Sequence, residues 1–195
     1  MLKRQKPLRR RPRQARSHFT RNAIFEAVVQ ILESRGEAAL TTNAIAERAG
    51  VSVGSLYQYF ASKQAILVEM ARIETARMAR RVARLSARVT DPDEAARLAI
   101  RAHLYAFRGR PVTRRAAVRA MMAEEGDERF GKRTDVTTRN LPAPDGASRI
   151  DAFVLTRAVT SVIRAAVLEG YSGLHTKAFE DALLRLVTGY RMVRN

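Results

Sequence analysis

The stretch from Leu40 to Lys63 reads LTTNAIAERAGVSVGSLYQYFASK, and its pattern decides the fold. Apolar residues spaced by one, three and four positions predict a first helix over Thr41 to Ala49. Gly50 ends this helix, because glycine adopts a positive φ without a Cβ clash. Ser52 is a typical helix N-cap and predicts a second short helix over residues 53–60. The stretch therefore indicates two helices joined by a tight turn, with a third helix beginning at its end.

Two helices joined by a short glycine-containing turn form the helix-turn-helix layout, whose second helix enters the DNA major groove. The second helix here reads VGSLYQYF. Leu56 and Phe60 lie four residues apart and are expected to pack inward. Tyr57 and Tyr59 lie two apart, so at least one of their hydroxyl groups should face outward. The helix has no Arg or Lys to bond guanine with two hydrogen bonds, so base preference should depend more on DNA shape.

Within this stretch, the frame IA-xx-AGVS-x-G-x-LY-x-YF-x-SK resembles the signature of the tetracycline-repressor (TetR) family of transcriptional regulators. The similarity covers about residues 20–70, the first third of the chain. The resemblance implies an all-α fold. It also implies an N-terminal three-helix DNA-binding domain with a helix-turn-helix, followed by a larger helical regulatory and dimerisation domain.

The resemblance also implies roles for single residues of the motif. Thr42 is similar to the family's phosphate-contacting hydroxyl, and Asn43 stands where some relatives reach a base. An asparagine amide can bond adenine N6 and N7 together. Val53 can touch a thymine methyl group, whereas Tyr57 can contact a base or a phosphate, or else pack in the core with its hydroxyl at the rim. The DNA-binding candidates are Thr42, Asn43, Ser52, Val53, Gly54, Ser55, Tyr57, Tyr59 and Lys63.

Composition points to a polyanionic partner. The chain has 195 residues, a formal net charge of +17 and no cysteine. Such a charge favours nucleic acid first and an acidic membrane surface second. No apolar run approaches the roughly 20 residues that span a bilayer, and no signal peptide is evident. We expect a soluble cytoplasmic protein whose partner is double-stranded DNA, with no membrane association.

The charge is uneven along the chain. Residues 1–16 hold eight Lys or Arg and no acid, whereas residues 17–63 hold four basic and four acidic side chains. We expect a disordered basic arm over 1–16, the helix-turn-helix domain over 17–63 and a helical ligand-binding and dimerisation domain over 64–195. The arm can lie on phosphates or enter a minor groove. The alternative is a solvated tail that aids solubility.

Apolar periodicity and caps predict the remaining elements. Asp91 and Pro92 form a strong helix start. Predicted helices cover 17–35, 61–89, 91–107, 112–125, 150–168 and 176–193, with a long polar loop over 126–148. The last two helices are apolar and joined by a short loop. They can pair with a twofold copy as a four-helix bundle, as the resemblance implies, or simply close the core of one subunit.

The larger domain is expected to hold a small-molecule effector. Methionine packs adaptably and suits a variable pocket, although ordinary core packing is the alternative. The ligand candidates are Met70, His103, Phe107, Met121, Met122, Val159 and Ile163. The three histidines lie far apart without metal-ligand spacing, and no catalytic motif is present. We therefore expect no metal, no cofactor and no enzymatic activity.

These observations favour a dimeric transcriptional regulator, and a repressor released from a palindromic operator by a small molecule in particular. One alternative is a constitutive architectural DNA-binding protein without a small-molecule switch, which the sparse base-reading chemistry permits. An enzyme with an appended DNA-binding domain is the third alternative.

Overall fold

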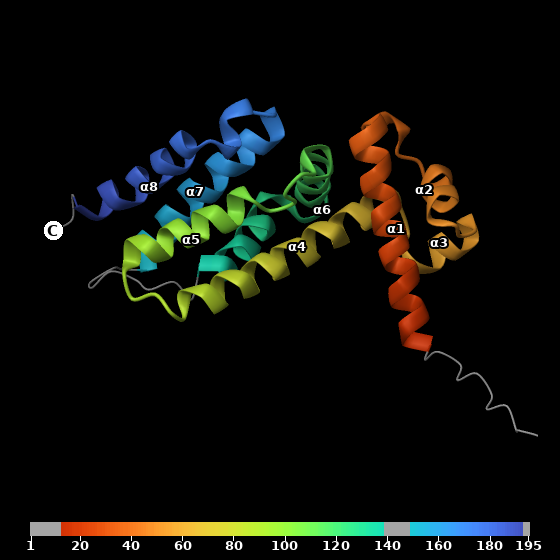
Figure 1. Ribbon diagram of the computed structural model, residues 1–195, viewed down its shortest axis with the longest axis horizontal. Helices are drawn as coiled ribbons and strands as arrows, with labels where there is room; N and C mark the ends of the chain where they lie inside the picture. Colours follow the sequence, from red (N-terminus) through yellow and green to blue (C-terminus); the bar gives the residue numbers. More distant parts are fainter. Residues whose placement is uncertain (1–12, 139–148, 193–195) are drawn as a thin grey trace, which may run out of the picture. The chain divides into compact units, whose positions relative to one another are not determined.

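A computed structural model describes residues 13–138 and 149–192, and these residues form helices without a strand among them. The all-α fold is therefore confirmed. Figure 1 shows the elements in chain order. They are α1 (Arg13–Arg35), η1 (Glu37–Ala39), α2 (Thr42–Ala49), α3 (Val53–Tyr59), α4 (Lys63–Ser86), α5 (Pro92–Leu104), α6 (Pro111–Thr138), α7 (Arg149–Glu169), η2 (Ser172–His175) and α8 (Lys177–Met192). None of the described helices is long and apolar enough to cross a membrane.

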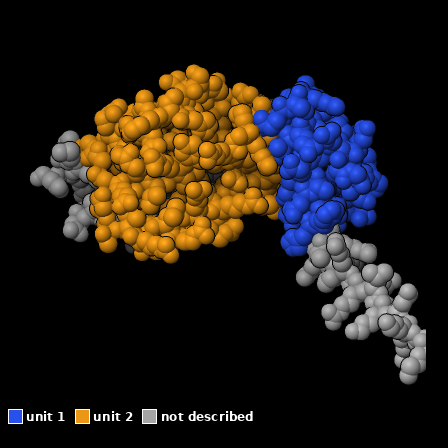
Figure 2. Space-filling view, viewed as in Figure 1, with its two compact units in different colours: residues 1–63 blue, residues 64–195 orange. Residues whose placement is uncertain are grey.

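The chain divides into two compact units, residues 1–63 and residues 64–195, coloured separately in Figure 2. The division falls at the start of α4. In unit 1, α1 packs against α2, and α2 packs against α3. Each helix contributes a fully buried side chain: Ile24 and Leu32 from α1, Ile45 from α2 and Leu56 from α3. Burying one such side chain contributes about 1.5–3 kcal/mol, so this small domain has a real core.

Helix α1 begins at Arg13, four residues before the predicted start at Ser17. The segment Arg13 to Arg16 was predicted to belong to a disordered arm, and this part of the prediction is wrong. Arg, Gln and Ala are strong helix formers, and they extend the helix without any apolar periodicity to signal it. Residues 1–12 of the predicted arm lie outside the described residues.

The start of α5 follows the prediction. Asp91 caps the helix, and its carboxylate accepts hydrogen bonds from the backbone N–H groups of Asp93 at 3.1 Å and Glu94 at 3.3 Å. The helix ends at Leu104 instead of the predicted Phe107. Phe107 is the one non-glycine residue with a positive φ (54°) among the described residues, so it has left the helical conformation.

Helix α6 continues to Thr138, so the predicted loop over 126–148 is wrong for its first thirteen residues. Gly126 and Gly131 suggested a break. A glycine inside a helix costs only about 1 kcal/mol relative to alanine, and strong helix formers such as Glu, Arg and Lys surround these two. Residues 139–148 lie outside the described residues.

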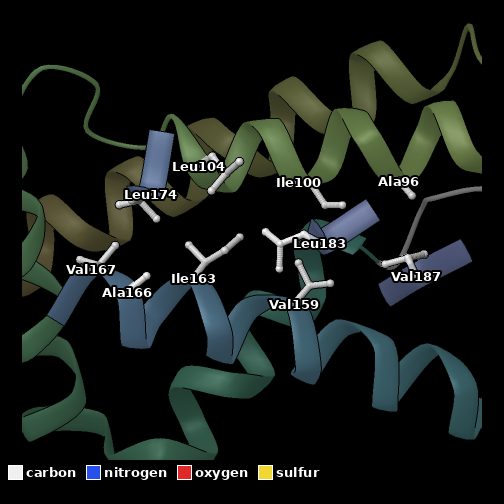
Figure 3. Packing of buried hydrophobic residues seen from close by; sticks show 10 residues of the cluster. All are labelled: Ala96, Ile100, Leu104, Val159, Ile163, Ala166, Val167, Leu174, Leu183 and Val187. Carbon is white, nitrogen blue, oxygen red and sulfur yellow. The ribbon is translucent and has the colours of Figure 1, made fainter. Parts of the chain in front are cut away.

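The main apolar cluster of unit 2 lies between α5, α7 and α8 (Figure 3). Ile100 and Leu104 of α5 face Val159 and Ile163 of α7, and Leu183 of α8 lies among them. The observed α7 and α8 begin and end within about one residue of the predicted bounds, because long apolar periodicity is a strong signal.

Candidate nucleic-acid interface

Hydrogen-bonded caps hold both helices of the motif. The Thr41 hydroxyl accepts a bond from the Ala44 N–H at 3.1 Å and caps α2. The Ser52 hydroxyl accepts a bond from the Ser55 N–H at 3.0 Å and donates to the Ser55 hydroxyl at 2.9 Å. Each cap satisfies an N–H group that a helix start leaves unpaired. The local sequence alone therefore fixes where α2 and α3 begin.

The turn between these helices depends on Gly50. Its φ is +67°, its N–H donates to Glu47 O at 3.1 Å, and the Val51 N–H donates to Ala46 O at 3.0 Å. This pair of bonds is the Schellman arrangement, in which a left-handed residue closes the helix end. The turn sets the direction in which α3 leaves α2.

Helix α3 has one buried face and one open face. Leu56 is fully buried and Phe60 is 7% exposed, as the spacing of four predicted. On the other side, Tyr57 is 52% exposed and Val53 is 36% exposed, and Gly54 is also exposed. The side chains of Ser55 and Tyr59 are half-buried. The outward face of α3 is therefore uncharged. It consists of the Tyr57 ring, the Val53 side chain and the backbone at Gly54.

The sequence reasoning missed Gln58, which is exposed on α3. It follows Gly54 by four positions and adjoins Tyr57, so it belongs to the same open face. A glutamine amide can bond adenine with two hydrogen bonds. The spacing of four from Gly54 was the signal that could have found it.

The other candidates lie at the starts of helices. Asn43 is exposed and Thr42 is half-buried in the first turn of α2. Ser52 is exposed, but its hydroxyl is engaged in the cap of α3. Lys63, one of the DNA-binding candidates, donates from Nζ to the Leu40 carbonyl at 2.8 Å. That bond ties the start of α4 to the segment before α2, and it uses one of the three ammonium protons.

Arg21 of α1 lies beside the end of α3. Its guanidinium carbon is 6.0 Å from the centre of the Phe25 ring and 5.9 Å from that of Phe60, distances typical of cation–π contacts. The two rings also contact each other, with centres 5.6 Å apart. The arginine is thus held next to the recognition helix.

The ligand candidates of unit 2 fall into separate places. Val159 and Ile163 belong to the α5–α7–α8 cluster shown in Figure 3. Met121 forms a second cluster with Ala71 and Ala117, against which Phe107 packs. Met70 and His103 are buried, and Met122 is half-buried. The structure therefore does not bring these seven residues into one described cluster.

A buried polar group lies next to the second cluster. With the proton on Nδ1, His103 donates to Ala99 O at 2.9 Å, and burial lowers its pKa. The Arg114 guanidinium donates to Leu104 O at 2.7 Å and to His103 O at 2.6 Å. Burial lowers the Arg114 pKa to about 10, while the charge of Glu74 acts in the opposite direction. Glu74 Oε1 also accepts a bond from the Phe107 N–H at 3.4 Å.

A groove of about 520 Å³ lies in unit 1, lined by α1 and α2. Its lining includes Gln30, Arg35 and Arg48, and the Arg48 Nε donates to Gln30 Oε1 at 2.6 Å. None of the seven ligand candidates borders this groove. Within the described part of the chain, no three His, Asp or Glu side chains are arranged to hold a metal ion.

A helix-turn-helix with an exposed second helix defines a DNA-binding domain of the kind found in transcriptional regulators. Residues 24–70 match the family model described as bacterial regulatory proteins, tetR family. This match shows a DNA-binding domain of the tetR type at residues 24–70, and the resemblance predicted from the sequence is confirmed.

Solved structures share the fold over nearly the whole chain. The fatty acid degradation regulator FadR from Bacillus halodurans is 17% identical, with a TM-score of 0.63 over 96% of this chain and 97% of that one. FadR from Bacillus subtilis, in complex with stearoyl-CoA, is 16% identical, with a TM-score of 0.61 over 85% and 96%. A TetR variant from Acinetobacter baumannii AYE, in complex with minocycline, is 21% identical, with a TM-score of 0.62 over 88% and 96%. Comparison with curated proteins gives no match.

Proposed function

We propose that this protein is a homodimeric transcriptional repressor that binds a palindromic operator and leaves it when a small molecule binds unit 2. The observation that carries the proposal is the open face of α3, where Val53, Gly54 and Tyr57 are exposed while Leu56 and Phe60 are buried. Tyr57 is a large aromatic side chain that is 52% exposed on a seven-residue helix. It is suited to contact a groove.

The motif divides into base-reading and phosphate-binding groups. Val53 and Tyr57 are exposed at the centre of α3, and Asn43 is exposed at the start of α2. These three side chains read base edges and thymine methyl groups. The hydroxyl groups of Thr42, Ser55 and Tyr59, together with Ser52 at the cap and the remaining protons of Lys63, position the helix on phosphates.

The outer face of α7 and α8 supports the homodimer. Val154 (39% exposed) and Val162 (42%) lie on one side of α7, and Leu186 (44%) lies on α8. Other positions of the same helices form the α5–α7–α8 cluster. Both helices are thus apolar on two sides, and a second copy related by a twofold axis covers the outer one. The dimer places two recognition helices about 34–36 Å apart, one turn of DNA.

The effector site is proposed for unit 2, with Met70, His103, Phe107, Met121, Met122, Val159 and Ile163 as its residues. Two solved structures of the same fold are complexes with small molecules, stearoyl-CoA in one and minocycline in the other. Helix α4 begins three residues after Phe60 and enters unit 2, so a shift of α4 displaces the recognition helix. The ligand releases DNA only if it prefers the displaced state.

The test begins with selection of duplexes from a random pool, followed by fluorescence anisotropy with the selected and a scrambled duplex. We expect at least a hundredfold preference for the selected duplex, and a loss of about 1–3 kcal/mol of that preference for Tyr57→Ala. Tyr105→Ala is the matched control, because Tyr105 is 40% exposed but lies in unit 2. A preference near one would support the architectural alternative instead.

A further inference from the structure

Arg114 of α6 places a positive charge in the interior of unit 2. The residue is 6% exposed, and its guanidinium donates to the carbonyl oxygens of Leu104 and His103 at the end of α5. Both of these acceptors are neutral. None of the ion pairs within the described residues includes Arg114. A buried charge in a folded protein usually has an opposite charge beside it, so this arginine is unusual.

The charge of Arg114 acts on the groups around it. Burial lowers the pKa of Arg114 to about 10, so the side chain remains charged at neutral pH. Burial is also the largest cause of the lowered pKa of His103 and of His175, and the Arg114 charge lowers both further. In the part of the chain that the structure describes, Glu74 of α4 is the acid whose charge acts on Arg114. The surroundings of Arg114 are therefore positive and only partly compensated.

Phe107 joins Glu74 to the second apolar cluster. Its N–H donates to Glu74 Oε1 at 3.4 Å, and its ring packs against the cluster of Ala71, Ala117 and Met121. Its φ of +54° is a left-handed conformation that is unfavourable for a residue with a side chain, so the surrounding contacts hold it in place. The Glu74 side chain is 27% exposed, so this edge of unit 2 is open to solvent.

We infer that unit 2 takes as its effector an amphipathic organic anion, whose carboxylate or phosphate group pairs with Arg114 and whose apolar part takes the place of the Phe107 ring. This inference rests on the proposed function, because it names the chemical class of the proposed effector. Arginine has five N–H donors, and the two carbonyl bonds use two of them, so the same guanidinium can also hold an anionic oxygen. The anion supplies the opposite charge that Glu74 supplies only in part.

The test measures binding of small molecules to the full chain by isothermal titration calorimetry without DNA. Octanoate and octyl phosphate share an apolar tail and differ in their anionic group, whereas octanol has the same tail without a charge. We expect octanoate or octyl phosphate to bind about 10- to 100-fold more tightly than octanol, and the tighter anion identifies the preferred group. Acetate, which lacks the tail, should bind at least about 10-fold more weakly than octanoate.

Two variants test the charges. Arg114→Met should bind both anions no more tightly than octanol. Glu74→Gln removes the negative charge but keeps a carbonyl oxygen that can accept the Phe107 N–H, so it should fold normally and bind either anion about 3- to 10-fold more tightly. Glu94→Gln is the matched control, because it removes the same charge at an exposed position in the first turn of α5 and should leave the affinity unchanged.

The outcomes are distinct. Anions that bind no more tightly than octanol, or do not bind at all, overturn the inference, and so does an unchanged anion affinity for Glu74→Gln. The Glu74 variant decides the matter even where Arg114→Met fails to fold. These measurements contain no DNA, so they are separate from the proposed function. That function fails if the wild type does not prefer its selected duplex, or if Tyr57→Ala leaves the preference unchanged.

Discussion

Replacing Arg114 by methionine should destabilise unit 2 by about 1–4 kcal/mol. The Arg114 side chain is 6% exposed, and it donates to the last two carbonyl oxygens of α5, at 2.7 Å to Leu104 O and 2.6 Å to His103 O. Each charge-assisted bond contributes about 1.5–3 kcal/mol, and the cation at a buried helix end adds about 1 kcal/mol. The substitution removes these contributions and leaves two buried carbonyls without their donor.

The loss is partly offset by relief of desolvation. Burial is the largest cause of the lowered Arg114 pKa, which falls well below its ordinary value to about 10. That difference corresponds to about 3 kcal/mol by which the fold disfavours the charged form. Methionine has a similar length and no charge, so it avoids this cost. The lost interactions of about 4–7 kcal/mol, less the relieved desolvation of about 3 kcal/mol, leave a net destabilisation of about 1–4 kcal/mol.

The assay is urea unfolding followed by far-UV circular dichroism at one protein concentration, because dimerisation makes stability depend on concentration. Arg114→Lys should fall between the wild type and Arg114→Met, since an ammonium can bond one carbonyl but cannot fork to both. Arg185→Met, at an exposed position of α8, should change stability by less than about 0.5 kcal/mol. Arg114→Met within 0.5 kcal/mol of the wild type would refute the reasoning, because the two carbonyl bonds would then contribute nothing net.

Three further predictions concern the turn, pH and assembly. Gly50→Ala should destabilise the folded protein by about 1–2 kcal/mol because the φ of Gly50 is +67°, even though no atom lies within 4 Å of the added Cβ. Gly54→Ala inside α3 should be neutral or stabilising in the same urea assay. Burial lowers the His103 pKa below 6.5, so below about pH 6.5 the unfolded chain binds more protons than the folded chain. The free energy of unfolding should therefore fall as the pH drops below about 6.5. His103→Gln should reduce this dependence on pH, measured by urea unfolding between about pH 5 and 6.5. Val162→Asp with Leu186→Asp should yield monomers in sedimentation velocity at micromolar concentration, and a dimer that persists would mean that another face mediates assembly.

The helix-turn-helix was predictable because its determinants are local. The Thr41 and Ser52 hydroxyls accept hydrogen bonds from N–H groups three residues further along the chain. The two bonds that close the turn at Gly50 span three and five residues. The inward Leu56 and the outward Tyr57 follow from helical spacing alone. Contacts between distant segments were not predictable in this way. The bond from Lys63 to the Leu40 carbonyl spans 23 residues, and no local pattern indicates it.

The difference between local patterns and contacts between distant segments also explains the wrong predictions in unit 2. Helix α5 was expected to reach Phe107, but it ends at Leu104, where a guanidinium ten residues further along the chain binds the final carbonyls. The segment over 126–138 was expected to be a loop because its glycines were given more weight than the helix formers around them. The ligand candidates were chosen by residue type, whereas packing of α5 against α7 and α8 decides which side chains meet.

The distribution of charge separates affinity from specificity in this chain. Helix α3 has no charged residue, and residues 17–63 hold four basic and four acidic side chains, although the whole chain has a net charge of +17. Counterion release scales with the number of phosphates that Lys and Arg neutralise, and it is blind to sequence. In the proposed function, the arginines outside α3 supply the salt-dependent affinity for any duplex, and Val53 and Tyr57 supply base discrimination through uncharged contacts. We therefore predict that rising salt concentration weakens binding to the selected and the scrambled duplex in parallel, so that the ratio of the two affinities stays constant.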